Sequence, residues 1–309
     1  MKRMVAIPRL GGETIKTVGG GLLKFSNSFA SIFRYNRSFR TGFILFLIIL
    51  VLGVGIGALA PTDPRRWYTD TPNRPPSLEY PLGTTTNGQN VFWLLTWSIR
   101  NSLIIGLITA LVASHVGLIL GMLAGARGGL MDRILMTITD SFVVIPSLPT
   151  LILLAVLLRD VMNIPLMGLL ISIFSWPWPS RQVRAMVLSL RERDFIATSI
   201  FSGYGVWGRV LRDYFLFVLP WHLVNATNTV LFAISSEAAL AVLGVSILSE
   251  ATLGVMIYWA LNYSALFRGL WWWLMSPVVT IILIFVSLFL ISRGISEYSN
   301  PRLRWQAGR

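Results

Sequence analysis

Three ionisable side chains of this sequence lie inside strongly apolar stretches, where a charge is costly. They are His115, Asp140 and Glu237. A charged group in a hydrocarbon layer is tolerated where it meets water or a partner, so such residues commonly mark ion pathways, substrate pathways and proton relays. Glu237 follows Ser236, and Asn228 lies on the same stretch. This stretch therefore has a polar side, suited equally to a water-filled path or to a hydrogen bond between helices.

Prolines accompany the polar residues. Pro146 follows Asp140, and Pro177 and Pro179 interrupt the next apolar stretch. A proline frees backbone carbonyls, which a membrane protein tolerates where they are buried or line a cavity. We therefore predict a path through the membrane lined by polar residues and one proline: Asp140, Pro146, Asn228, Ser236 and Glu237. For His115 a structural role is favoured, because a backbone carbonyl easily satisfies a neutral imidazole.

The sequence lacks the motifs of the enzyme classes that a membrane protein of this kind could belong to. It has no G-x-x-x-x-G-K-[ST] motif and no lysine after residue 24, so we expect no P-loop ATPase site. With no cysteine and only two histidines, it lacks the ligands of a metal-dependent membrane hydrolase. A serine hydrolase is not excluded by counting, but neither histidine lies near a G-x-S-x-G motif. We expect no enzyme activity and no cofactor in this chain, so any energy must come from another polypeptide.

The composition places these residues in membrane helices. Hydrophobic residues make up 54% of the 309 residues and charged residues only 13%, which is typical of an all-α polytopic membrane protein. Each apolar stretch is roughly long enough to cross a hydrocarbon layer of about 30 Å, the fourth being short unless it continues past Pro179. The sequence predicts six spans: 41–60, 99–124, 134–158, 164–179, 223–247 and 272–292.

The basic residues predict the orientation. The net charge is +13, and 20 of the 26 Lys and Arg residues fall on one side of the six predicted spans. Basic loops face the cytoplasm, so we expect both termini and the 181–220 loop inside a cell membrane. The positive charge is therefore explained by the orientation of the chain in the membrane, and we expect no nucleic-acid partner. The predicted segments are a basic tail (1–40), a retained anchor helix (41–60), an irregular outer loop (61–98), a membrane domain (99–299) and a short tail (300–309).

Small residues predict one close helix contact. Gly117, Gly121 and Gly125 recur at spacing four in the second apolar stretch. This spacing lets a neighbouring helix approach closely, so we interpret these glycines as packing residues.

The 181–220 loop contains an amphipathic helix. Ile196, Ile200 and Tyr204 recur at helical spacing, with Phe201 beside them. The residues before Phe195 carry charge, and we expect the helix to end at Gly203. Such a surface could lie on lipid headgroups, could be an ordinary folded loop, or could seat in a groove of a cytosolic protein that moves it.

Several short motifs, in order and over nearly the full length, resemble one transporter family. The chain is similar to the second permease subunit of the peptide, opine and nickel class of ABC importers, the dipeptide and oligopeptide permease C family. The matching pieces are Asn36 to Pro64 with its exit Ala60-Pro61-Thr62-Asp63-Pro64, Pro81-Leu82-Gly83-Thr84, Gly128-Gly129-Leu130-Met131-Asp132-Arg133, Asp140, Pro146-Ser147-Leu148, Glu237-Ala238-Ala239-Leu240 and Asn300-Pro301-Arg302-Leu303-Arg304.

The resemblance implies a type I ABC importer permease fold with six spans and several partners. These are a homologous second permease subunit, two cytosolic ABC ATPases that bind ATP and Mg²⁺, an extracellular substrate-binding protein and membrane lipid. The 191–205 helix would be the coupling helix, with contacts to the ATPase from Arg191, Asp194, Phe195, Ile196, Ile200, Phe201 and Gly203. The sequence departs from the family at this helix in two ways. Ala197-Thr198-Ser199 stands in place of the family's usual Glu-Ala-Ala, and Leu219-Pro220 comes about four residues later than in the family pattern.

The sequence says least about the substrate. Peptides come first, since nickel uptake would favour His or Cys ligands. Oligosaccharides are close behind, because Trp178, Trp259 and the run Trp271-Trp272-Trp273 could stack on sugar rings, although indoles near span ends are more often interfacial anchors. A stand-alone secondary transporter or channel is the alternative from another class.

Overall fold

The computed structural model describes residues 31–299, and the predicted tails, at 1–30 and 300–309, lie outside this range. Within it the regular secondary structure is helical, and the one β-type pairing is an isolated bridge between Thr84 and Asn90. The α-helices after residue 36 are α2 (Arg37–Leu50), α3 (Val91–Arg127), α4 (Gly129–Val144), α5 (Ser147–Leu157), α6 (Ile164–Ser175), α7 (Pro177–Arg191), α8 (Asp194–Phe201), α9 (Val206–Arg209), α10 (Phe215–Val242), α11 (Leu253–Asn262) and α12 (Trp271–Ser299). Short π or 3₁₀ segments continue α2 (Val51–Gly55 and Ile56–Leu59), follow α5 (Arg159–Val161) and join α9 to α10 (Val210–Tyr214).

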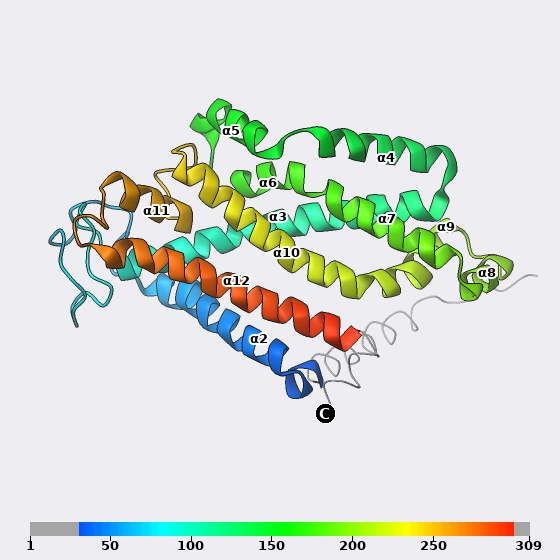
Figure 1. Ribbon diagram of the computed structural model, residues 1–309, viewed down its shortest axis with the longest axis horizontal. Helices are drawn as coiled ribbons and strands as arrows, with labels where there is room; N and C mark the ends of the chain where they lie inside the picture. Colours follow the sequence, from blue (N-terminus) through cyan, green and yellow to red (C-terminus); the bar gives the residue numbers. More distant parts are fainter. Residues whose placement is uncertain (1–30, 300–309) are drawn as a thin grey trace, which may run out of the picture.

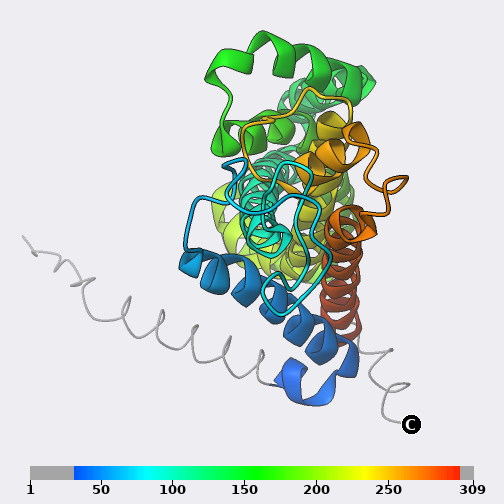
Figure 2. The same ribbon diagram turned by 90° about the vertical axis from the view of Figure 1, so that its left-hand side faces the viewer.

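Helix α3 is the centre of the fold. It packs against α6, α7 and α10, and more than half of its residues are buried. Figure 1 shows α2 and α12 side by side along one edge, with α4 and α5 along the opposite edge. Figure 2 looks onto the end that carries α11 and residues 61–90, and it shows the same separation of α2 from α4 and α5. Helix α8 lies at the other end of the molecule.

The prediction of six spans is not confirmed. Four helical segments of the described chain are long and apolar enough to cross a membrane: 37–59, 91–127, 206–242 and 271–299. Helices α4 and α5 make a fifth only if they count as one span, because the chain bends by 80° between them at Pro146. The fourth predicted span, 164–179, divides at Trp176 into the 12-residue α6 and the arginine-bearing α7, since Pro177 has no N–H to donate across the junction.

Two predicted loops contain more helix than expected. Helix α3 begins at Val91, inside the predicted outer loop 61–98, and the Asn90 side chain caps it by accepting from the Phe92 amide at 3.0 Å. Residues 61–90 are irregular, as predicted, and are held by hydrogen bonds such as that from the buried Thr84 hydroxyl to the Thr71 carbonyl, at 2.7 Å. The predicted 181–220 loop is mostly helical, because it contains the end of α7, all of α8 and α9 and the start of α10.

The three glycines at spacing four do allow a close helix contact, as predicted. They lie where α3 meets α7. A Cβ on Gly117 would stand 2.6 Å from the Pro179 Cβ, and one on Gly125 would stand 2.7 Å from the Val187 Cβ. Real side chains do not approach that closely, so only glycine fits at this interface.

Candidate functional site

A half-open groove forms where two helix breaks meet the middle of α10. Its volume is about 420 Å³. The bend at Pro146 supplies one wall, and the α6–α7 junction at Trp176 supplies another. Irregular backbone at membrane depth is tolerated where it lines such a cavity. The lining residues are Phe142, Val143, Ile145, Ser147, Phe174, Ser175, Pro177, Trp178, Pro179, Asn225, Asn228, Thr229 and Phe232.

Helix α10 gives the groove its polar wall. The Asn228 side chain is exposed there and has no hydrogen-bond partner among residues 31–299. Behind it, Asn225 and Thr229 are buried against α3, where Ser114 donates to the Thr229 hydroxyl at 3.2 Å. The network fixes α10 against α3 while Asn228 faces the groove. A solute passing here would meet one free amide among aromatic and proline side chains.

The structure brings only part of the predicted path to this groove. Asn228 lines it and Pro146 forms its bend, but Asp140, Ser236 and Glu237 do not line it. The sequence prediction missed Thr229, and it named Trp178 only as an indole that could stack on sugar rings or anchor at an interface. Trp178 stands between Pro177 and Pro179, so the two prolines were the signal that could have placed it at the groove.

Asp140 forms one of two ion pairs that join α4 to α7. Its carboxylate accepts from Arg181 at 2.6 Å, and Asp132 accepts from Arg184 at 2.7 Å. Both acidic residues are on α4 and both arginines on α7. The Asp140 charge is therefore compensated by a basic partner, which is how a membrane protein tolerates it.

Glu237 is a buried link between α10 and α11. It is 1% exposed, and its Oε1 accepts from Ser246 at 2.9 Å and from Thr252 at 2.7 Å. Thr252 also caps α11 by accepting from the Val255 amide. The other carboxylate oxygen lies beside Gly254, where a Cβ would come within 3.0 Å of it. These contacts give Glu237 a hydrogen-bonded link from α10 to the segment that leads into α11, and a role in the path stays a prediction.

We expect the Glu237→Ala variant to lose about 1–3 kcal/mol of stability, because it leaves buried hydroxyls without their acceptor. Thermal unfolding of the purified protein in detergent measures this loss. Ser235→Ala is the matched control, since Ser235 is exposed on the same helix and bonds only to the Leu231 carbonyl. A Glu237→Ala protein of normal thermal stability that fails in transport would instead give Glu237 a role in the path.

His115 has the structural role that the sequence favoured. Its Nδ1 lies 2.8 Å from the Leu111 carbonyl oxygen, one turn earlier on α3. Its ring contacts that of His222 on α10, with centroids 4.8 Å apart. The two imidazoles help to pack α3 against α10.

Helix α8 has an inner and an outer apolar side. Ile196 is 1% exposed and packs with Val187, Val210 and Tyr214 of the chain's own core. Phe201, at the end of α8, is 90% exposed. Phe195 is between these extremes, stacked on Phe217 with ring centroids 5.1 Å apart. The predicted single face is therefore divided.

This division corrects one of the predicted coupling residues, Ile196, while a coupling role for the exposed residues Arg191, Asp194, Phe195 and Phe201 stays a prediction. Ile196 holds α8 to the chain and is not available on the outer surface. Arg191 ends α7 and donates to the Gly125 carbonyl at 3.1 Å, which ties α7 to α3. Asp194 begins α8. The side chain of Ile200 lies outside the described set.

The turn after α8 depends on Gly203. Its φ is +81°, in the left-handed region that favours glycine. Helix α8 ends at Phe201, two residues before the predicted end. After the turn, Arg212 donates to the Tyr204 hydroxyl and lies over its ring, and Ser199 donates to Asp213 at 2.6 Å. These bonds hold the returning chain beside α8 and leave Phe201 at the tip.

Comparisons with known proteins identify the class. Residues 117–305 match the family model described as binding-protein-dependent transport system inner membrane component. The dipeptide transport system permease protein DppC of Bacillus subtilis is 28% identical over 270 residues, covering 87% of this chain and 83% of that protein. The oligopeptide transport system permease protein OppC of Mycobacterium tuberculosis is 26% identical, covering 88% and 93%. OppC of Lactococcus lactis is 32% identical, covering 68% and 71%.

The chain belongs to the family of binding-protein-dependent transport system inner membrane components. Within that family it is a multi-pass permease of the peptide class of ABC importers. This confirms the resemblance drawn from the short motifs.

Proposed function

We propose that this chain forms half of the translocation path of an ATP-driven peptide importer and that α8 couples it to a cytosolic ATPase. The exposed Phe201 at the tip of the otherwise anchored α8 is the observation that carries the coupling role. A large aromatic side chain exposed on a fixed element is typical of an anchor for a partner.

The packing around α8 offers a route from that tip to the groove. Ile196 sits in one cluster with Val183 and Val187 of α7 and with Val218 of α10. The same two helices line the groove, through Pro177–Pro179 and Asn225–Phe232. A force on α8 would therefore reach both walls of the groove through a close-packed core, which transmits displacement because it is nearly incompressible.

The proposed assembly contains the partners that the resemblance implies. They are a homologous second permease subunit, two ATPases that hold ATP and Mg²⁺, an extracellular substrate-binding protein and the surrounding lipid. The names of the relatives support this, since they are permease proteins of transport systems. The same names favour a dipeptide or oligopeptide over an oligosaccharide as the substrate.

Reconstitution tests the proposal. The complete importer in proteoliposomes should take up a labelled peptide mixture only when the binding protein is outside and ATP is present at the ATPases. Liposomes that hold this chain alone should show no uptake. Uptake by the chain alone would establish a stand-alone transporter, and uptake of oligosaccharides with no uptake of peptides would replace the substrate class.

We also expect the two ends of the molecule to lie on opposite sides of the membrane. Ser77 and Ser189 are both exposed, and the native chain has no cysteine. A Ser77→Cys variant should react with an impermeant maleimide on intact cells, while Ser189→Cys should react only after permeabilisation, because the basic end faces the cytoplasm. Mass shift of the labelled protein on a gel measures this. The reverse pattern would contradict a cytoplasmic position for α8.

A further inference from the structure

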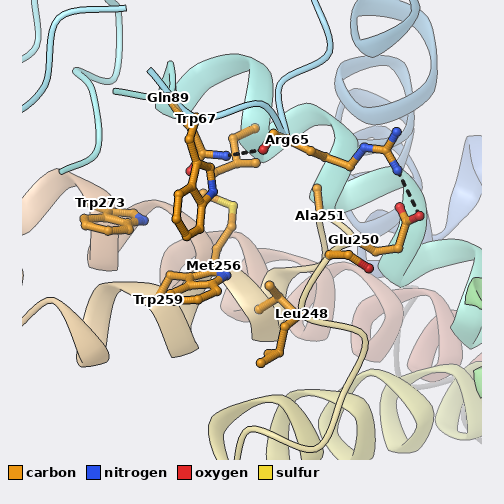
Figure 3. Close-up of a pocket in the computed structure, with 12 residues that line it drawn as sticks. Arg65, Trp67, Gln89, Leu248, Glu250, Ala251, Met256, Trp259 and Trp273 are labelled. Atoms are coloured by element: carbon orange, nitrogen blue, oxygen red, sulfur yellow. Dashed lines mark hydrogen bonds and ion pairs between the residues drawn. The ribbon is translucent and has the colours of Figure 1, made fainter. Parts of the chain in front are cut away.

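A second cavity, separate from the groove, lies at the α11 end of the molecule (Figure 3). Its volume is about 360 Å³. Four segments that are distant in sequence form its walls: residues 65–67 and 89, the start of α3, the 248–251 connection with α11, and the start of α12. The lining residues are Arg65, Trp67, Gln89, Leu94, Leu248, Ser249, Glu250, Ala251, Val255, Met256, Trp259 and Trp273.

Aromatic and aliphatic side chains dominate the interior. Trp67 and Trp259 meet edge to face, with ring centroids 5.5 Å apart. Val255 and Met256 of α11 lie on the same side as Trp259. Such a surface favours an apolar group, because burying it removes apolar area from water.

The charged residues of the cavity already have partners. Arg65 donates to Glu250 at 2.9 Å and to Asp63 at 2.8 Å, and the Asp63 hydrogen bond raises the pKa of the Arg65 guanidinium above its usual range. The Gln89 amide donates to the carbonyls of Pro64 and Arg65. Ionic groups at this rim therefore hold the wall together, and the cavity presents no free charge to an occupant.

One polar atom of the wall is both buried and without a partner among the described residues. Trp273 is 0% exposed, and its indole N–H has no acceptor among residues 31–299. Its neighbour Trp272 donates to the Thr84 carbonyl at 3.2 Å. In Figure 3 the Trp273 nitrogen is directed toward Trp67 and Met256. A buried N–H without an acceptor is unfavourable and rare, so this donor points to an occupant that carries a neutral acceptor.

The wall facing this donor is held in place from outside the cavity. Residues 248–251 lie between Ser246 and Thr252, and both of these hydroxyls donate to Glu237. Asn101 of α3 also donates to the Ala251 carbonyl at 2.7 Å. The 248–251 connection is held by hydrogen bonds at both ends, so the shape of the cavity is determined by the fold.

We propose that this cavity binds one uncharged apolar residue of a peptide. Its side chain lies among Trp67, Trp259 and Met256, and its backbone carbonyl accepts from the Trp273 N–H. A peptide residue joins an apolar side chain to a neutral acceptor, which is the combination that the wall presents. The choice of a peptide rests on the proposed function, whereas the apolar group and the acceptor follow from the cavity itself.

The test uses N-acetyl-leucinamide as the ligand and the complete importer in nanodiscs, labelled with 5-fluorotryptophan. The fluorine signals of Trp67, Trp259 and Trp273 are assigned by their loss in single Trp→Phe variants. N-acetyl-leucinamide should shift all three signals saturably. N-acetyl-glycinamide should bind at least about tenfold more weakly, because it lacks the apolar side chain.

The variant Trp273→Phe keeps the ring and removes the donor. It should weaken binding of N-acetyl-leucinamide about two- to tenfold, as followed at Trp67 and Trp259. Trp207→Phe is the matched control, because Trp207 is exposed on α9 at the far end and should leave the affinity unchanged. Unshifted signals up to the solubility limit, or equal affinity of wild type and Trp273→Phe, would overturn the inference.

A peptide uptake assay on the same complex separates the two proposals. Peptide uptake without binding of N-acetyl-leucinamide would remove the cavity site and leave the proposed function intact. Binding without peptide uptake would support the cavity site and contradict the proposed function.

Discussion

Replacing Phe201 with Asp should uncouple the importer while leaving the permease folded. Phe201 is 90% exposed, so the free chain loses little packing, and surface substitutions usually change stability by about 0.5 kcal/mol or less. In a desolvated contact with an ATPase, however, an unpaired carboxylate costs about 3–5 kcal/mol. Even a loss of about 2 kcal/mol would weaken ATPase binding about 30-fold.

The measurement is pull-down of the ATPase together with ATP-dependent peptide uptake in vesicles. Phe267→Asp is the matched control, since Phe267 is 93% exposed at the α11 end and should leave ATPase association unchanged. Ile196→Asp is unsuitable, because Ile196 is in the chain's own core and its variant should fail to fold. Normal association and full uptake with Phe201→Asp would exclude the tip of α8 as the coupling contact.

The second large effect is expected at the contact of α3 with α7. A Cβ on Gly121 would overlap the Ser180 carbonyl oxygen and stand 2.8 Å from the Val183 Cβ. Because the first obstacle is backbone, a rotamer change cannot relieve it, and the two helices must separate. We expect Gly121→Ala to cost about 2–3 kcal/mol and Gly121→Leu to abolish the folded state.

Thermal unfolding and the fraction of monodisperse protein in detergent measure this cost. Gly55→Ala provides the control within another membrane helix, since its Cβ would have only the Val51 Cγ1 nearby, at 3.6 Å. That substitution should be neutral or stabilising by up to about 1 kcal/mol, through helix propensity. Equal stability of Gly121→Ala and wild type would show that the helices do not pack this closely.

The sequence predicted the helical membrane class and the long spans well, because apolar runs as long as α3 and α12 have few alternatives to a membrane helix. It predicted less about the interrupted spans. Pro146 and Pro177 predict that a helix is interrupted. The size of the bend between α4 and α5, 80°, depends on what packs on either side of it. Spacing along the chain carries no such information.

Predictions for the site divided in the same way. Asn228 and Pro146, which the structure places at the groove, could be singled out because a polar residue and a proline in apolar surroundings are visible in the sequence. The partners of Asp140 and Glu237 were not visible, because Arg181 is on another helix and Thr252 lies at the cap of α11. For α8, periodicity identified the apolar residues but could not tell that Ile196 faces inward and Phe201 outward, since that depends on where α7 and α10 pass.

Helix α10 contributes a residue to three different sites. Val218 packs in the cluster under α8, Asn228 lines the groove, and Glu237 forms the link to α11. Pro220 lies inside the helix near its first end and removes one backbone hydrogen bond there, which makes it the natural pivot. From Pro220 to Glu237 the rod is about 26 Å long. A tilt of about 5° at the pivot would carry Glu237 about 2 Å, and Asn228 about half as far. A small displacement of α10 next to α8 would therefore become a larger displacement at the α11 end, where the second cavity lies.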